Sequence, residues 1–361
     1  MGFFSRGNKF PVDGRVRLQP PLLSPPQSPS NPPTQTILLT GASQGMGKEL
    51  AKLLSQRGAS IILVARNVDK LKSATDYARA AAKSPTQRFH FISADCTSEA
   101  DNARLFAEAL AWNNGTAPDV VWANAGTSTP GLFLDQKMAT MKSQMDINYW
   151  AAVFLAQQTL KAWFYPETPY KKDAAPQPTR HFIVTSSVLG FCQLPGYGGY
   201  SPAKAALKSL IDGLRQEVLL YNGARRSKSR DSASIPAPFD VAINMVVPAT
   251  ILSPGEINEN LTKPAVTKML EETDPKQTEL EAATGALRGL ESGCTIAGTS
   301  WLAELMRVSS MGSSKREGLV VDTVGQWVAS LVWPFLGFDW DRKIFAWGEK
   351  EGMPGYRPDS I

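Results

Sequence analysis

This sequence has few cysteines and few histidines, and its first residues do not resemble a secretory signal. It has three cysteines and two histidines in 361 residues. An odd number of cysteines without a Cys-x-x-Cys pair argues against a disulfide framework or a zinc site and favours a reducing compartment. His90 and His181 have no partner at metal-ligand spacing, so we expect no metal. The first residues contain no apolar core of the length that a secretory signal has, and Arg6 stands where a myristoylation motif has Ser or Thr.

Excess positive charge is confined to two short segments. The formal net charge is +5, but residues 1–33 and 223–238 each carry four basic residues against one acidic residue, so the remaining chain is nearly neutral. Neither segment has interleaved aromatic residues or helical periodicity, which argues against a nucleic-acid partner. We expect a disordered Pro-rich tail over 1–33 and a solvated loop over 223–238. Weak attraction of this loop to an anionic membrane surface is an alternative.

What is present is a regular alternation of strand-like and helix-like segments across residues 34–310. Hydrophobic residues make up 43% of the chain, an ordinary value for a folded protein. Short apolar runs predict strands at 36–40, 60–65, 88–93, 120–122, 181–185 and 240–247. Helical composition and spacing predict helices at 48–57, 69–82, 98–112, 138–164, 201–221 and 278–290. This order predicts a single α/β domain with a Rossmann-like, doubly wound parallel sheet and loop inserts at 165–179 and 223–238.

A glycine-rich turn follows the first predicted strand at once. Gly41, Gly45 and Gly47 form G-x-x-x-G-x-G before an amphipathic helix. Glycines permit a tight turn and a close approach of the backbone to a ligand, and a helix N-terminus attracts the pyrophosphate of a dinucleotide. The turn therefore predicts a nicotinamide cofactor site.

The residue after the second predicted strand indicates whether the cofactor is NAD or NADPH. An NAD site normally has an acidic residue there for the ribose 2′-hydroxyl, whereas this chain has Arg66, which suits a 2′-phosphate. Ser43 from the turn and Lys70 would support the same phosphate. We therefore expect NADPH; the alternative is that Arg66 is an ordinary surface arginine.

A serine, a tyrosine and a lysine downstream carry the predicted chemistry. Ser187 precedes Tyr200 by thirteen residues, and Lys204 follows Tyr200 by four, which places the phenol and the ammonium on one helix face. A free tyrosine titrates near pH 10, and a neighbouring lysine cation favours the phenolate. The spacing predicts that Lys204 lowers the pKa of Tyr200 and that Tyr200 acts as an acid–base catalyst.

Two more motifs, Asn124-Ala125-Gly126 and Asp146-Ile147-Asn148, lie in this order between the glycine turn and Ser187. Together, these motifs resemble the short-chain dehydrogenase/reductase family over about residues 34–255. The resemblance implies that Tyr200 passes the proton, Ser187 positions the substrate oxygen, Lys204 binds the nicotinamide ribose and Asn148 holds a water of the proton relay. It also implies that Asp95 bonds the adenine. The complete set of cofactor contacts it implies is Gly41, Ser43, Gln44, Gly45, Met46, Gly47, Arg66, Asn67, Lys70, Asp95, Cys96, Asn124, Gly126, Tyr200, Lys204 and Ile251.

Two further stretches resemble a narrower group, the fungal-type 3-ketodihydrosphingosine reductases. Residues 63–71 (LVARNVDKL) match a run of that group, and residues 253–264 resemble its T-P-G-(…)-E-N-x-T-K-P signature, with Ser253 in place of Thr. Pro248-Ala249, where most short-chain reductases have Pro-Gly, is shared with the group. The resemblance implies NADPH-dependent reduction of 3-ketosphinganine to sphinganine in sphingolipid biosynthesis, at the endoplasmic reticulum membrane with a cytosolic active site.

Several alternatives remain open at this point. The chain could be a reductase of another lipophilic ketone, such as a steroid, retinoid or fatty-acyl ketone, or a non-catalytic NADPH-binding membrane scaffold. We expect substrate contacts from residues 189–197 and from the segment after Pro248, with the acyl tail leaving toward the C-terminal end. The resembled family commonly forms homodimers or homotetramers.

The C-terminal part, residues 311–361, is rich in tryptophan. Trp327, Trp333, Trp340 and Trp347 lie within 21 residues, and the uncharged run 323–338 has sixteen. Sixteen residues are fewer than the ~20 that a membrane-spanning helix needs. Tryptophans beside Arg342 and Lys343 are typical of a membrane interface. We expect a membrane-associated helical extension, with a core helix or a dimer-contact helix as the alternative.

Overall fold

The computed structural model describes residues 35–171, 174–227 and 235–352. The predicted tail over 1–33, part of the basic insert and the last nine residues of the C-terminal extension lie outside these ranges.

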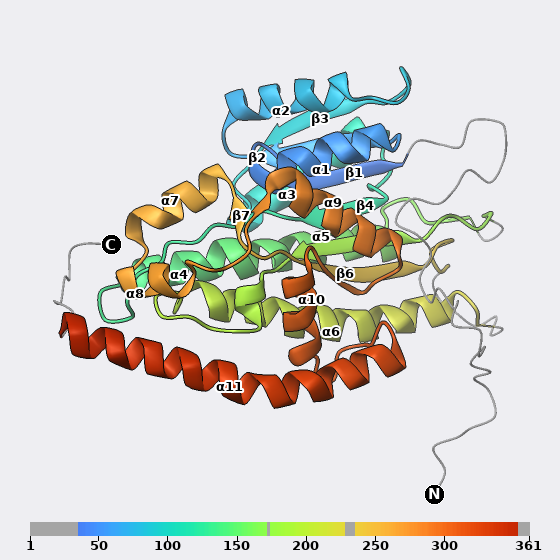
Figure 1. The fold of residues 1–361 in the computed structure, drawn as a ribbon. Helices are drawn as coiled ribbons and strands as arrows, with labels where there is room; N and C mark the ends of the chain where they lie inside the picture. The colour runs from blue at the N-terminus through green and yellow to red at the C-terminus, as the bar shows by residue number, and fades with distance from the viewer. Residues whose placement is uncertain (1–34, 172–173, 228–234, 353–361) are drawn as a thin grey trace, which may run out of the picture.

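A seven-stranded parallel sheet forms the centre of the molecule (Figure 1). Its strand order is β3-β2-β1-β4-β5-β6-β9. The strands are β1 (Thr36–Thr40), β2 (Ser60–Ala65), β3 (Phe89–Ser93), β4 (Val120–Ala123), β5 (Arg180–Thr185), β6 (Val241–Val247) and β9 (Ile296–Gly298). The order reverses between β1 and β4, which makes their carboxyl ends the switch point where doubly wound sheets bind ligands. The predicted doubly wound sheet is therefore confirmed, with β9 as a short strand that the sequence did not indicate.

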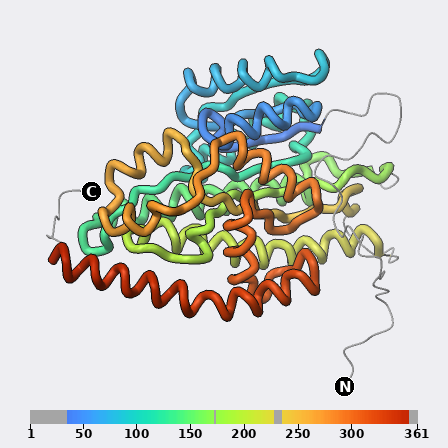
Figure 2. Tube along the Cα trace, in the orientation of Figure 1, coloured from blue at the N-terminus to red at the C-terminus, as the bar shows by residue number. Residues whose placement is uncertain are grey.

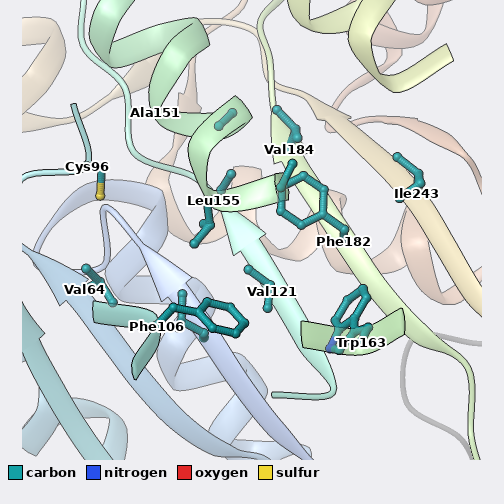
Figure 3. Close-up of a cluster of buried hydrophobic side chains, with 14 of the residues drawn as sticks. Val64, Cys96, Phe106, Val121, Ala151, Leu155, Trp163, Phe182, Val184 and Ile243 are labelled. Carbon is teal, nitrogen blue, oxygen red and sulfur yellow. The ribbon is translucent and has the colours of Figure 1, made fainter. Parts of the chain in front are cut away.

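Helices cover both faces of this sheet. One face packs against α1 (Gly45–Gln56), α2 (Val68–Ala80) and α9 (Glu279–Glu291). The other packs against α3 (Glu99–Trp112), α5 (Ala151–Phe164) and α6 (Tyr200–Ala224). Figure 3 shows part of this second core, where Phe106 of α3, Trp163 of α5 and Phe182 of β5 lie among aliphatic side chains. The near-continuous apolar strands are explained by this burial from both sides.

The helix predicted over 138–164 is interrupted at its centre. It consists of α4 (Met138–Met145), a π-helical turn η1 (Asp146–Trp150) and α5. Within this turn the side-chain amide of Asn148 donates to the backbone oxygen of Gln144 at 2.9 Å. π-Helical turns inside α-helices are frequent at functional sites, and this one contains a candidate catalytic residue.

The first part of the basic insert differs from the predicted solvated loop. Helix α6 continues to Ala224, and both Arg225 and Arg226 form ion pairs with Asp240, at 2.9 and 2.6 Å. The two guanidinium groups therefore share the single carboxylate of Asp240, the residue directly before β6, so one positive charge of the insert is neutralised. This reduces the positive charge that the segment offers to an anionic surface.

Four further helices follow β6, beside a small two-stranded sheet of β7 (Ile251–Leu252) and β8 (Gln277–Thr278). They are α7 (Pro254–Thr262), α8 (Ala265–Leu270), α10 (Trp301–Ser309) and α11 (Leu319–Glu351). Figures 1 and 2 show α11 lying along the outside of the α/β body, below α6 in this view. Its contacts with the body are made mainly to α10 and α8.

Helix α11 is longer than the uncharged run from which it was predicted. It has 33 residues, about 50 Å at 1.5 Å per residue. Among the described residues it is the one helix whose length and composition would allow it to cross a membrane. Leu331 and Phe335 are 72% and 77% exposed. The predicted helical extension is present. It is not a core helix, because most of its side chains are exposed.

Candidate active site

The glycine-rich turn joins β1 to α1 at the switch point of the sheet. Gly41 and Gly45 have φ angles of 65° and 62°, in the left-handed region that side chains disfavour. A Cβ at Gly47 would lie 2.2 Å from the carbonyl oxygen of Gly41. The first turn of α1 has no acidic residue and no side-chain cap. The turn therefore presents backbone N–H groups and a helix N-terminus to an anion, which fits the pyrophosphate of a dinucleotide.

Two basic residues lie beside this turn, as predicted for a 2′-phosphate. Arg66 is exposed directly after β2, and the backbone N–H of Ala42 donates to Val64 near the end of that strand at 3.3 Å. Lys70 Nζ donates to Gln44 Oε1 of the turn at 2.7 Å. Asn67, also predicted as a cofactor contact, caps α2 by accepting from the Lys70 N–H at 2.9 Å.

Other predicted cofactor contacts have side chains that are already engaged. Asp95 follows β3, and its Oδ1 accepts from the hydroxyl of Thr97 at 2.8 Å. The side chains of Met46 and Cys96 are buried in the two hydrophobic cores, so only their main chains could contact a cofactor. Ile251 is half-buried in β7. Ser43 is half-buried in the glycine turn.

A hydrogen-bond network connects the ends of β1, β4 and β5. Asn124 donates from Nδ2 to the carbonyl oxygen of Gly41 at 3.4 Å, and its Oδ1 accepts from the Thr185 hydroxyl at 2.9 Å. Lys204 then donates from Nζ to the carbonyl oxygen of Thr185 at 3.0 Å. The network therefore fixes Asn124 and Lys204 relative to the glycine turn, although they are far apart in the sequence.

The predicted Asn148 lies close to this network. It is buried in η1, accepts from the backbone N–H of Thr127 at 3.2 Å and donates to its carbonyl oxygen at 2.8 Å. A Cβ at Gly126 would lie 2.8 Å from Asn148 Oδ1 and 3.1 Å from Lys204 Nζ. Gly126 thus allows Asn148 and Lys204 to approach each other, as a relay between them requires.

Three of the four predicted catalytic residues, Ser187, Tyr200 and Lys204, meet at the start of α6. Tyr200 is the first residue of this helix, and Lys204 Nζ lies 5.6 Å from the centroid of its ring. Ser187 follows β5 closely and interacts with the Tyr200 hydroxyl. The Ser187 hydroxyl also accepts from the backbone N–H of Leu189 at 3.2 Å, which holds it in place. The structure therefore brings these three residues together as the spacing predicted.

The predicted direction of the Tyr200 pKa shift is wrong. Burial, together with the Glu259 carboxylate, raises the pKa of Tyr200, and the hydrogen bond with Ser187 offsets only part of this. Burial also lowers the pKa of Lys204 to about 7, so this lysine is only partly charged near neutral pH. The spacing predicted that Tyr200 and Lys204 share a helix face. It did not show that Tyr200 is buried, and the effect of this burial on the pKa of Tyr200 outweighs the effect of a nearby lysine charge. A tyrosine that stays protonated is suited to donate a proton.

Sequence reasoning missed a group of charged residues beside Tyr200. Glu271 of the α8 C-terminus pairs with Lys263 at 2.6 Å and accepts from the Tyr197 hydroxyl at 2.8 Å. The rings of Tyr197 and Tyr200 have centroids 6.0 Å apart. Glu259 and Lys263 belong to the 253–264 segment that was noted for its resemblance, and its Glu-x-x-x-Lys spacing on a helix was the available signal.

Comparison with known proteins agrees with this geometry. The family model described as short chain dehydrogenase matches residues 35–224. The chain is 42% identical over 353 residues to the 3-ketodihydrosphingosine reductase of Aspergillus fumigatus, covering 98% of this chain and 89% of that protein. It is 38% identical over 360 residues to the 3-ketodihydrosphingosine reductase of Neurospora crassa, with coverages of 99% and 89%.

Solved structures show the same fold. A short-chain dehydrogenase from Sphingobium yanoikuyae in complex with NADPH aligns with a TM-score of 0.57 at 20% identity, over 79% of this chain and 97% of that one. A short-chain dehydrogenase/reductase from Burkholderia phymatum in complex with NAD aligns with a TM-score of 0.58 at 17% identity, over 76% and 92%. The chain belongs to the short-chain dehydrogenase family of oxidoreductases, whose fold binds a nicotinamide cofactor.

Proposed function

We propose that this protein reduces 3-ketodihydrosphingosine (3-ketosphinganine) to sphinganine in sphingolipid biosynthesis, with NADPH as the cofactor. The observation that carries this proposal is the similarity to two fungal reductases of that name, which extends over 98% and 99% of the chain. It therefore includes the catalytic domain, residues 34–310, and the C-terminal extension, residues 311–361. The assembled Ser187, Tyr200 and Lys204 support a catalytic protein rather than a scaffold.

The proposed mechanism assigns one task to each residue of the site. When bound, the cofactor would supply the hydride for the carbonyl carbon. Tyr200 donates its hydroxyl proton to the substrate oxygen, because a phenol carries its proton at neutral pH and the raised pKa of Tyr200 keeps it so. Ser187 holds the same oxygen and stabilises the charge that develops on it. Lys204 binds the nicotinamide ribose, and Asn148, with Thr127, holds a water that returns a proton to Tyr200 through Lys204.

The choice of NADPH rests on the surroundings of the glycine turn. Arg66 and Lys70 place positive charge beside the position where a ribose 2′-phosphate would lie, and no acidic residue replaces Arg66 there. A guanidinium and an ammonium both form charge-assisted hydrogen bonds with phosphate. These residues, with Gly41, Gly45 and Gly47, would hold the cofactor.

We place the protein at the endoplasmic reticulum membrane, with its active site facing the cytosol. Helix α11 supports the membrane part of this proposal, because its exposed apolar side chains continue along its whole length. Trp327 is exposed at 67%, and Arg342 and Lys343 lie on the same helix. Tryptophans and basic residues of this kind settle at the membrane interface. The contact of α11 with α8 would bring the membrane near the substrate site.

A homodimer or homotetramer is the proposed assembly. A groove of about 320 Å³ lies between α5 and α6 and is lined largely by apolar and aromatic side chains, including Leu160, Phe164 and Leu214. The neighbouring Leu219 and Leu220 are exposed. An apolar helical face of this kind suits a second copy of the chain.

The test is a substrate and cofactor panel with the purified full chain. We expect NADPH to be oxidised with 3-ketodihydrosphingosine, and more slowly with NADH in its place. A steroid, a retinoid and a fatty-acyl ketone serve as competitors for the substrate assignment. Faster turnover of one of these would replace the proposed substrate, a preference for NADH would overturn the role of Arg66, and no turnover of any ketone would leave the scaffold alternative.

A further inference from the structure

The charged group beside Tyr200 contains one carboxylate on α7 that has no ion pair. Lys263 and Glu271 neutralise each other at 2.6 Å, with side chains that are only 4% and 13% exposed. Tyr197 donates to the same Glu271 at 2.8 Å. The only buried cation of the group is therefore already engaged. Asp274 adds a further carboxylate nearby, and burial and Glu271 raise its pKa.

Glu259 is that carboxylate. It lies on α7 with the Tyr197 and Ser128 hydroxyls as its polar neighbours. Within the part of the chain that the structure describes, no lysine, arginine or histidine forms an ion pair with it within 4 Å. The Ser128 Oγ is buried and has no well-formed hydrogen bond of its own among these residues. Burial raises the pKa of Glu259 against the opposing effect of Lys263.

Glu259 lies on the side of α7 that faces Tyr197. It is one helical turn before Lys263, whose backbone N–H donates to the Glu259 carbonyl oxygen and whose Nζ lies 5.9 Å from the Tyr197 ring centroid. The rings of Tyr197 and Tyr200 are 6.0 Å apart, and the Glu259 charge raises the pKa of Tyr200. Figure 1 shows α7 and α8 at the same end of the molecule as α4. Glu259 is half-buried, and a carboxylate partly withdrawn from water without a cation costs free energy unless a ligand supplies the opposite charge. This carboxylate is thus complementary to a positively charged group close to the substrate carbonyl.

We propose that Glu259 binds the ammonium group of a 2-amino ketone and thereby selects sphingoid ketones from other lipophilic ketones. This inference rests on the proposed function, because the amino group of 3-ketodihydrosphingosine is on the carbon next to its carbonyl. A carbonyl oxygen held by Ser187 and Tyr200 places that ammonium one carbon away, on the side of Glu259. The Ser128 hydroxyl lies beside the same carboxylate and accepts a hydrogen bond from the ammonium or donates one to the substrate.

Glu271 is not the ammonium site. It already accepts from Lys263 and Tyr197, so a second cation would have to displace one of them. Its role is to hold Lys263 away from Glu259, because a lysine paired with Glu259 would repel the substrate. A ketone without the amine would leave the half-buried Glu259 unpaired, and sites whose polar groups lose their partner discriminate strongly against such analogues.

The experiment compares two soluble ketones of equal chain length, a 2-amino-1-hydroxy-3-ketone and the same molecule without the amino group. We expect the wild-type protein to prefer the amino ketone by at least about 100-fold in kcat/KM. Glu259→Gln keeps the shape and removes the charge, and it should reduce this preference to below about 10-fold, mainly through KM for the amino ketone. Glu259→Asp, which keeps the charge, should recover part of it.

Glu256→Gln is the matched control on the same helix, because Glu256 pairs with Lys276 and Asn260 instead of facing Tyr200. It should keep the wild-type preference. A Glu259→Gln variant that keeps the wild-type preference, or that loses activity toward both ketones equally, overturns the role of Glu259 while the proposed function stands. A wild-type protein that reduces neither ketone overturns the proposed function, and this inference with it.

Discussion

Helices α1 and α11, near the two ends of the chain, differ in the burial of their apolar side chains. In α1, Leu50 and Leu54 are fully buried against the sheet and α9. In α11, Leu331 and Phe335 face outward, and only Asp322 and Ala329 are buried along 33 residues. The α/β body therefore completes its hydrophobic core from its own residues. Helix α11 keeps an exposed apolar surface, and a lipid membrane is the partner that we propose for it.

The two regions are joined by a small number of polar contacts. Arg307 of α10 forms a buried ion pair with Asp322 at 2.8 Å, and Asp322 also accepts from the backbone N–H of Glu317 at 2.7 Å. Glu317 in turn accepts from the backbone of Thr295, next to β9, at 2.7 Å. These contacts fix the start of α11 to the edge of the sheet and leave most of its length free of the body.

The largest effect should follow from making the exposed face of α11 polar. Burying a leucine or phenylalanine side chain contributes about 1.5–3 kcal/mol, so Leu331→Asp with Phe335→Asp should lower binding to anionic lipid vesicles at least about 100-fold. Vesicle flotation measures this. The same change at two exposed apolar residues of the body away from the α5–α6 groove, Val68→Asp in α2 with Leu280→Asp in α9, is the control and should bind as the wild type does. Equal binding of both variants would mean that α11 does not contact lipid.

Removing the polar anchor should release α11 from the body. Arg307→Ala leaves Asp322 buried and unpaired, which typically costs about 3–5 kcal/mol. Hydrogen exchange of the amides at the start of α11 should become faster, while the exchange of β1 and β4 stays slow. Arg342→Ala breaks an exposed pair with Asp339 and should change little. Unchanged exchange in Arg307→Ala would show that apolar contacts alone hold α11.

A methyl group in the glycine turn should damage the body and spare α11. In Gly47→Ala the new Cβ would meet the Gly41 carbonyl oxygen at 2.2 Å, so the turn must move. We expect a loss of about 1–3 kcal/mol in unfolding free energy and weaker NADPH binding, measured by denaturation and by titration of the cofactor. Gly223→Ala has open space around its Cβ and is the control. A Gly47→Ala variant with wild-type affinity would exclude this turn as the cofactor site.

The smallest effect concerns the pH dependence of the cofactor-free body. The pKa of Lys204 is lowered from 10.5 to about 7 by burial. Between these pH values the unfolded chain binds a proton that the folded chain lacks, so the free energy of unfolding should rise with pH through this window. Lys204→Met should reduce that slope by up to about 1.4 kcal/mol per pH unit. Lys208→Met, one turn further on α6, should keep it, and equal slopes for all three proteins would place Lys204 in water.

The parallel sheet and the catalytic residues could be predicted from the sequence, because both depend on the spacing of residues that are close along the chain. Apolar runs separated by helical segments define parallel strands, and Tyr200 and Lys204 share a helix face at four residues. The π-helical turn at Asn148 was not predictable, since it depends on contacts with Thr127 and Gln144 that the fold creates. The pKa of Tyr200 and the unpaired state of Glu259 depend on burial between distant segments, which spacing does not show. The exposure of α11 likewise emerges only from its position on the body.

The most direct measurement of the central claim compares wild-type protein with Tyr200→Phe in the reduction of 3-ketodihydrosphingosine by NADPH, with product formation followed beside cofactor oxidation. We expect one sphinganine for each NADPH oxidised by the wild type. Loss of the proposed proton donor should lower kcat of Tyr200→Phe by about 100-fold or more, whereas Tyr221→Phe, on the outer part of α6, should retain the wild-type rate. A Tyr200→Phe variant that forms sphinganine at the wild-type rate would contradict the account.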